Sequence, residues 1–225
     1  MAATHGKFND QLEHDNGYLQ LLWDTHYVTE GRDNLDGGAL QTSVLSLKHG
    51  FLELLVWNGW GYDSDYNELN FMPTVRYDYR DLSFYVNYNR LEFTEQGLSD
   101  NEIGSGISYG GLVDNLFLDV DWYHSFEANG SFLEFSIASL FEHNDVFRLE
   151  SRIIIGVNEN YIADGHDGLN HFAAQVTGEY NLVDSINLHT KLVYTHPINR
   201  QQNTYAGDRL LQRTLQASVG LEFYF

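Results

Sequence analysis

The stretch NLFLDVDWYHS, residues 115–125, decides the fold class of this chain. Apolar side chains alternate in it with acidic or aromatic ones, which gives two sets: Leu116, Leu118, Val120 and Trp122 on one side, Phe117, Asp119, Asp121 and Tyr123 on the other. Successive side chains of a β-strand point to opposite faces, so this period of two is typical of a strand. The stretch predicts a strand with one apolar face and one face that carries charge.

The same period of two continues over nearly the whole chain. No helical repeat persists beyond two turns, and no stretch approaches the roughly 20 apolar residues of a transmembrane helix. The pattern predicts twelve strands, near 17–28, 37–48, 51–58, 66–79, 82–93, 101–110, 115–125, 131–142, 146–157, 168–180, 185–195 and 210–225. These residues form an all-β protein.

The gaps between the strands alternate in length without exception. The long gaps are rich in Asp, Asn, Gly and Glu: 29–36, 59–65, 94–100, 126–130, 158–167 and 196–209. The others are tight turns: 49–50, 80–81, 111–114, 143–145 and 181–184. A soluble sandwich has no reason for this alternation, whereas an outer-membrane barrel joins its strands by long external loops and short periplasmic turns. An even number of strands places both termini in the periplasm.

The polarity of the two faces favours the same architecture. One face of each strand is apolar over about ten residues, the length that crosses a bilayer obliquely. Aromatic residues near the strand ends suggest two interfacial girdles: Tyr27, Trp122 and Tyr194 outside, Tyr79, Tyr109 and Tyr180 inside. We therefore predict an up-and-down transmembrane barrel over 17–225, a periplasmic segment over 1–16, and a place in the outer membrane of a Gram-negative bacterium.

The last strand and one proline add detail to this prediction. Alternation continues from Leu215 to the terminal Phe225, which resembles the C-terminal strand that outer-membrane barrels present to their assembly machinery. The expected partners are thus that machinery, the lipid bilayer and lipopolysaccharide. Pro73 falls inside the fourth strand. Proline has no N–H to donate to a neighbouring strand, and a closed barrel has no edge strand on which this would not matter. We expect a bulge there, or a different strand register.

Composition excludes several classes of protein. The net charge of −20 argues against a nucleic-acid partner, because such binding needs a basic face. The chain has no cysteine, which excludes disulfides, thiolate metal sites and a cysteine nucleophile. Residues 1–7, MAATHGK, contain no apolar run behind the lysine, so we expect a mature sequence rather than one that carries a signal peptide.

The first third of the chain resembles a known family. The segments DTHYVTEGRDNL (24–35), GALQ (38–41) and GFLELLVWN (50–58) are similar to the start of the TorF-like porins. Gly38 stands where that family usually has proline and Asn58 where it has glycine, and beyond about residue 95 only the general barrel pattern remains. The resemblance implies a porin-like barrel and supplies no catalytic residues.

The inward face is where function is expected. Strand parity assigns twelve acids to it: Asp24, Glu53, Glu68, Asp78, Glu102, Asp119, Asp121, Glu134, Glu142, Glu150, Glu179 and Glu222. It assigns four bases to the same face: Arg76, Arg148, Arg152 and Lys191. Acidic walls in a narrow space select cations. The sequence therefore favours a channel for small hydrophilic solutes that prefers cations, unless an inward-folded loop, most plausibly 196–209, closes it.

Two other function classes stay open. The interior charges could pair into a network that makes a plugged, structural or ligand-binding barrel. A lipid-active enzyme could use His124 and Ser125, but these neighbours on a strand face opposite sides and cannot form a nucleophile–base pair. We therefore expect no enzyme.

One loop suggests a metal ion. Asp63, Asp65 and Asn67 space oxygen ligands in the manner of a calcium loop, although the glycine and the distant glutamate of an EF-hand are missing. Calcium in this external loop is the only cofactor that the sequence suggests.

Overall fold

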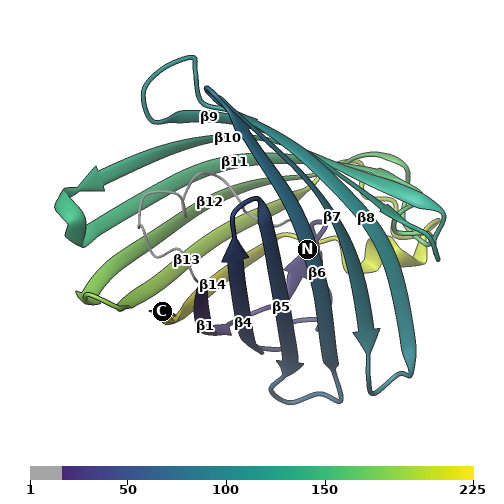
Figure 1. The fold of residues 1–225 in the computed structure, drawn as a ribbon. Coiled ribbons are helices and arrows are strands. Elements are labelled where there is room, and N and C mark those ends of the chain that lie inside the picture. The colour runs from purple at the N-terminus through teal and green to yellow at the C-terminus, as the bar shows by residue number, and fades with distance from the viewer. Residues whose placement is uncertain (1–16) are drawn as a thin grey trace.

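The computed structural model describes residues 17–225, and twelve strands of this part of the chain close into one antiparallel barrel (Figure 1). The barrel strands are β1 (Gly17–Asp24), β4 (Leu40–His49), β5 (Leu52–Gly61), β6 (Asn67–Tyr79), β7 (Leu82–Phe93), β8 (Leu98–Tyr109), β9 (Leu116–Ser125), β10 (Gly130–His143), β11 (Phe147–Glu159), β12 (Gly168–Val183), β13 (Ile186–Pro197) and β14 (Thr214–Tyr224). Each pairs with its neighbours along the chain, and β1 pairs with β14 to close the ring. The predicted fold class and strand number are confirmed. The expected segment 1–16 lies outside the described residues.

The predicted alternation of long and short connections holds for most of the barrel, but the connection 110–115 is longer than its neighbours 94–97 and 126–129. Short turns such as 50–51 and 184–185 lie at one end of the barrel, and the longer connections 25–39, 160–167 and 198–213 at the other. Gly50 has a φ of +59°, the left-handed conformation that a tight hairpin turn requires. The amide of Phe225 donates to the carbonyl of Gly17 over 3.2 Å, so the two ends of the described chain meet at the short-turn end. That this end faces the periplasm stays a prediction.

The bulge expected at Pro73 is not found. Pro73 lies opposite Leu54 in an unbroken β5–β6 register. On the other side, the β6–β7 register is the same before and after, from Phe71 opposite Arg90 to Thr74 opposite Asn87, but Met72 and Pro73 have no paired partner in β7. The missing N–H is thus accommodated by a local gap in one ladder, without an extra residue.

The first strand is shorter than predicted. It ends at Asp24 instead of 28, and the chain then forms a small hairpin of β2 (Val28–Thr29) and β3 (Arg32–Asp33). Tyr27, expected in the outer aromatic girdle, is only 8% exposed and stacks on Trp57 with ring centroids 5.9 Å apart. The girdle prediction for Tyr27 is wrong because the backbone leaves the barrel wall before this residue.

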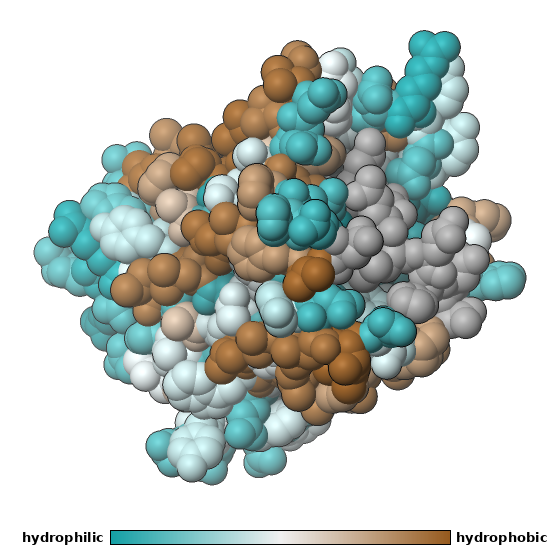
Figure 2. Space-filling model, turned by 90° about the vertical axis from the view of Figure 1, so that its left-hand side faces the viewer, coloured by the Kyte–Doolittle hydropathy of each residue, from teal (hydrophilic) through white to brown (hydrophobic). Residues whose placement is uncertain are grey.

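The outer surface of the barrel is apolar. The exposed hydrophobic residues alternate along the strands with buried or polar ones, as Leu118, Ile153 and Val176 do. Figure 2 shows hydrophobic side chains, in brown, spread over the barrel face turned to the viewer. Residues 17–225 contain no helix long and apolar enough to cross a membrane. Among these residues the helical elements are the short 3-10 turns η2 (Asn144–Val146) and η3 (Ala206–Arg209).

The apolar core lies inside the barrel, against one part of its wall. It consists of one residue from the β1–β4 connection and five from β4, β5 and β6: Tyr27, Leu40, Val44, Leu55, Trp57 and Met72. These side chains alternate with the outward-facing ones on the same strands. Strand parity alone did not identify this apolar patch, because the interior was expected to be polar throughout.

Candidate functional site in the barrel interior

The structure places the predicted interior residues on the enclosed face of the wall, where they make contacts with one another or line a cavity. They come from eight strands and are Asp24, Glu53, Arg76, Asp119, Asp121, Glu134, Arg148, Glu150, Arg152, Glu179 and Lys191. Their neighbours in sequence point outward. Whether these residues border a path for solutes stays a prediction.

Arg152 on β11 is the centre of the tightest charge network. Its Nη1 lies 2.6 Å from Asp119 Oδ2, and its Nε lies 3.0 Å from Glu150 Oε1. Ser136 accepts a further hydrogen bond from Nη1 over 2.7 Å. The side chains of all three charged residues are less than one tenth exposed. One guanidinium thus holds two carboxylates, which leaves this network with a net negative charge.

The remaining interior bases form looser pairs. Arg76 lies 3.9 Å from Glu53, and Lys191 lies 3.9 Å from Asp24. Arg148 Nε bonds Glu142 over 2.9 Å, while its Nη1 is 3.8 Å from Glu179. Together with the Arg152 network, these pairs include all four predicted bases. Several interior acids are held in another way.

Neutral donors hold these other carboxylates. Glu68 accepts hydrogen bonds from the hydroxyl of Tyr27 over 2.6 Å, from Tyr66, and from the amide of Asn70 over 2.7 Å. Glu102 accepts them from Tyr161 and from Asn89. Hydroxyl and amide donors satisfy the oxygens without cancelling their charge.

Asp121 accepts a hydrogen bond from the hydroxyl of Tyr85 over 2.6 Å. Among the described residues, the interior acids outnumber the interior bases. Tyr66 and Tyr161 were missed from the sequence. Tyr161 lies in a connection without a periodic pattern, whereas Tyr66 began the predicted strand 66–79 and shares the parity of Glu68.

A cavity of about 300 Å³ lies between the apolar and the charged parts of the interior. Glu134, Glu150 and Lys191 line it from the charged part, and Trp57 from the apolar part. Residues 27–31 of the first connection also reach it. Among the described residues that line the cavity none comes from 196–209, and whether this loop could close the interior stays a prediction. The earlier hairpin enters instead, because Tyr27 covers the apolar wall.

His171 on β12 is a further lining residue that the sequence analysis did not identify. Its Nε2 lies 3.9 Å from Glu134, and the ring stacks on Phe132. A single histidine in a strand pattern carries no signal of its own, although its parity with Gln175 and Glu179 places it on the inward face.

A polar cluster ties three long connections together at the other end of the barrel. Arg32 of β3 donates to Asp208 of η3 over 3.1 Å and to Asn170 over 2.9 Å. His166 Nδ1 lies 2.7 Å from Asp208. Burial would raise the pKa of Asp208, but hydrogen bonds from the amide of Gln201 and from His166 outweigh it and lower that pKa.

The candidate calcium ligands lie in and just after the β5–β6 connection. Asp63 and Asp65 are exposed in the β5–β6 connection, while Asn67 Oδ1 accepts a hydrogen bond from Thr94 over 2.9 Å. Calcium binding there stays a prediction.

The residues weighed for lipid chemistry are separated. Ser125 Oγ donates to Asp100 over 2.8 Å on the inward side, and His124 stacks on Trp122, an outward residue of the same strand. These two neighbours form no nucleophile–base pair.

Comparison with known proteins adds a fold likeness. No protein family model and no curated protein sequence matches the chain, so the resemblance to the TorF-like porins stays a prediction. Among solved structures, the KdgM porin is similar, with a TM-score of 0.63, 9% identity, and 92% of this chain and 99% of that one covered. The NanC porin is similar too, with a TM-score of 0.64, 10% identity, and coverage of 92% and 100%.

A second KdgM porin structure, in complex with disordered oligogalacturonate, has a TM-score of 0.64 at 10% identity and coverage of 92% and 99%. At such low identity these likenesses concern the fold alone. The chain has the fold of twelve-stranded outer-membrane porins.

Proposed function

We propose that this protein is a channel of the bacterial outer membrane for the passive diffusion of small hydrophilic solutes, with a preference for cations and neutral molecules. The short-turn end and both chain ends face the periplasm, and the acidic connections face the outside. An apolar outer surface that contacts lipid, combined with a charged interior, supports this proposal. The fold shared with the KdgM and NanC porins supports it as well.

The single observation that carries the preference for cations is the way in which the interior acids are held. Arg152 faces two carboxylates, and Glu68 and Glu102 bind hydroxyl and amide donors, so acids exceed bases among the described interior residues. The field of such an excess of acids lowers the energy of a cation and raises that of an anion. One KdgM porin structure holds oligogalacturonate, a polyanion. The interior charge of this chain disfavours a ligand of that kind.

Single-channel recording of the refolded protein in a planar bilayer tests the proposal. With a KCl gradient, the reversal potential should show K⁺ preferred over Cl⁻ at about 0.1 M salt. Most of that preference should vanish at about 1 M, where the Debye length falls from about 10 Å to about 3 Å. The double variant Glu68→Gln/Glu102→Gln should lower the selectivity more than the control Asp63→Asn/Asp65→Asn in an exposed loop. An anion-selective channel would contradict the proposal.

A closed structural barrel is the second candidate, and one observation favours it. Residues 27–31 reach the cavity, and the Arg32–Asp208 pair ties this hairpin to another connection. If the intact protein conducts nothing while a variant with residues 28–33 shortened conducts, the hairpin is a plug. If neither conducts, the barrel is structural.

A further inference from the structure

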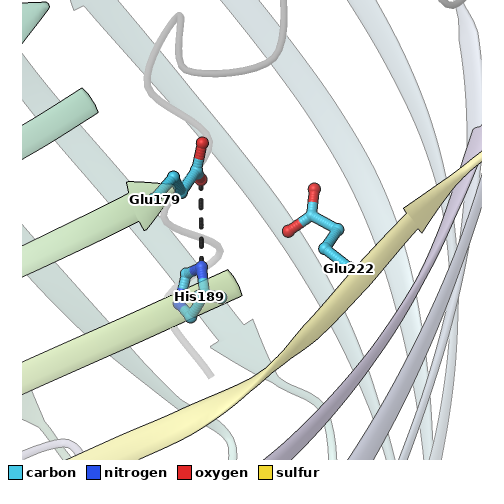
Figure 3. Close-up of side chains that lie close together, drawn as sticks. All are labelled: Glu179, His189 and Glu222. Atoms are coloured by element: carbon cyan, nitrogen blue, oxygen red, sulfur yellow. Dashed lines mark ion pairs between the residues drawn. The ribbon is translucent and has the colours of Figure 1, made fainter. Parts of the chain in front are cut away.

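Three side chains meet inside the barrel close to its short-turn end. Glu179 comes from β12, His189 from β13 and Glu222 from β14, three adjacent strands. Each offers one ligand atom, and these atoms lie within 4.8 Å of one another. Figure 3 shows the imidazole beneath the carboxylate of Glu179 and the carboxylate of Glu222 turned toward both. The strand register explains the meeting, because Glu179 and His189 are directly paired.

Several atoms in and beside this cluster that could donate an electron pair to a metal ion have no hydrogen bond. Within residues 17–225, no hydrogen-bond partner exists for Glu179 Oε2, His189 Nδ1 or Asn187 Oδ1. Glu179 is only 6% exposed and Asn187 only 4%. Asn187 shares the inward face of β13 with His189 and lies opposite Glu222 on β14. Buried polar atoms without a hydrogen bond are rare in proteins, so these atoms indicate a missing partner that accepts electron pairs.

The charges nearby leave room for a cation. Two carboxylates are partly balanced by Arg148, whose Nη1 is 3.8 Å from Glu179 Oε2 but whose Nε bonds Glu142 over 2.9 Å. Gln20 donates to Glu222 Oε2 over 2.9 Å and adds no charge. Lys191, the next inward residue of β13, lies near Asp24 instead.

We propose that Glu179, His189 and Glu222 bind a divalent transition-metal ion, with Asn187 Oδ1 as a further oxygen ligand. One imidazole nitrogen and carboxylate oxygens suit Zn²⁺ or a similar first-row ion, whereas Ca²⁺ and Mg²⁺ prefer oxygen alone. The three strands already hold the donors close together, so binding needs only small side-chain movements. The site does not depend on the proposed channel function, because an ion can bind to an open or a closed barrel.

Titration of the purified, refolded barrel in detergent with Zn²⁺ tests the site without any transport. Isothermal titration calorimetry at pH 7.5 should show one Zn²⁺ per chain, and Ca²⁺ should bind at least about tenfold more weakly, because an imidazole ligand disfavours it. His189→Gln and Glu222→Gln should each weaken Zn²⁺ binding by about 10–100-fold, and circular dichroism should show that each variant keeps its β-structure. Co²⁺ should give visible absorption bands that His189→Gln abolishes.

The matched control is His143→Gln, which changes an exposed histidine that stacks on Phe141. This variant should bind Zn²⁺ like the unchanged protein. Equal binding of Zn²⁺ and Ca²⁺ would reduce the site to general attraction by an acidic interior, and it would overturn the proposal. Unchanged Zn²⁺ affinity in both site variants would do the same. A failure of conduction would leave these results unaffected.

Discussion

Two parts of the same interior wall bury their side chains through different contacts, apolar packing in one and ion pairs in the other. On β4, β5 and β6 the inward residues are apolar, and Tyr27 from the first connection covers them. On β9 and β11 the inward residues are charged, and Arg152 joins Asp119 to Glu150. An apolar wall attracts a covering segment of chain because removing its surface from water is favourable. The side chains of the charged wall instead form ion pairs and hydrogen bonds with those of nearby strands.

The two parts therefore differ in the contacts that cover their side chains. Both parts line the cavity, the apolar part through Trp57 and the charged part through Glu134 and Glu150, but Tyr27, just before β2, packs on the apolar part. The outcome of changing a residue should therefore depend on which part of the wall it belongs to.

The largest effect is expected from Trp57→Ala on the apolar wall. Trp57 is 6% exposed and stacks on Tyr27, so its removal leaves a cavity and should lower the free energy of unfolding by about 3–5 kcal/mol. Urea unfolding in lipid vesicles, followed by tryptophan fluorescence, measures this loss. Trp60→Ala on the outward face of the same strand is the control and should cost less, since Trp60 is 38% exposed. If both variants lost the same free energy of unfolding, the packing of Trp57 on Tyr27 would not stabilise the barrel more than an outward tryptophan does.

Arg152→Met on the charged wall should have the next largest effect. The substitution leaves Asp119 and Glu150 without their guanidinium, which should cost about 3 kcal/mol. The triple variant Arg152→Met/Asp119→Leu/Glu150→Leu removes the whole network and should recover most of the loss, because no unpaired charge remains. The same unfolding experiment measures both variants. A triple variant less stable than the single one would show that the network stabilises the barrel by itself.

The outer face of the charged wall should respond differently from its inner face. Leu118→Arg places a charge among lipid chains and should cost about 2–4 kcal/mol. Asp121→Arg, on the inward face of the same strand, should cost less and should reduce the preference for cations. Folding yield in vesicles and the reversal potential separate the two results. If both variants lose the same stability, the assignment of β9 faces is wrong.

The smallest effect is expected where the covering hairpin is tied down, at Asp208. Its pKa lies below the ordinary value of 3.8, so the carboxylate stabilises the loop cluster above that pH and the contribution is lost as the pH falls through the lowered pKa. The protection of the amides of residues 198–213 against hydrogen exchange, relative to an unfolded chain at the same pH, should therefore fall below about pH 4. Asp208→Asn should show faster exchange already at pH 7 and little further change on acidification. Asp63→Asn, in an exposed loop, should leave this exchange unchanged.

The sequence by itself determined the barrel and the faces of its strands. A period of two, as in residues 115–125, is a local property of the strand, so Asp119 and Leu118 were assigned to opposite sides without knowledge of any neighbour. The same period, repeated along the chain, predicted the number of strands, and the alternation of long and short gaps indicated a barrel. The inward acids followed from parity alone.

The tertiary structure decided what the strand pattern does not encode. Tyr27 turns inward, and Arg32 meets Asp208 across 176 positions, because connections have no repeat and take their conformation from distant contacts. Glu179, His189 and Glu222 belong to three separate strands, and only the register of β12, β13 and β14 brings their ligand atoms within 4.8 Å. The side of the sheet to which a side chain points is set within its own strand, whereas the side chains that it meets depend on how the strands pair. The sequence therefore determined which side chains face inward, and the closed barrel decided which of them meet.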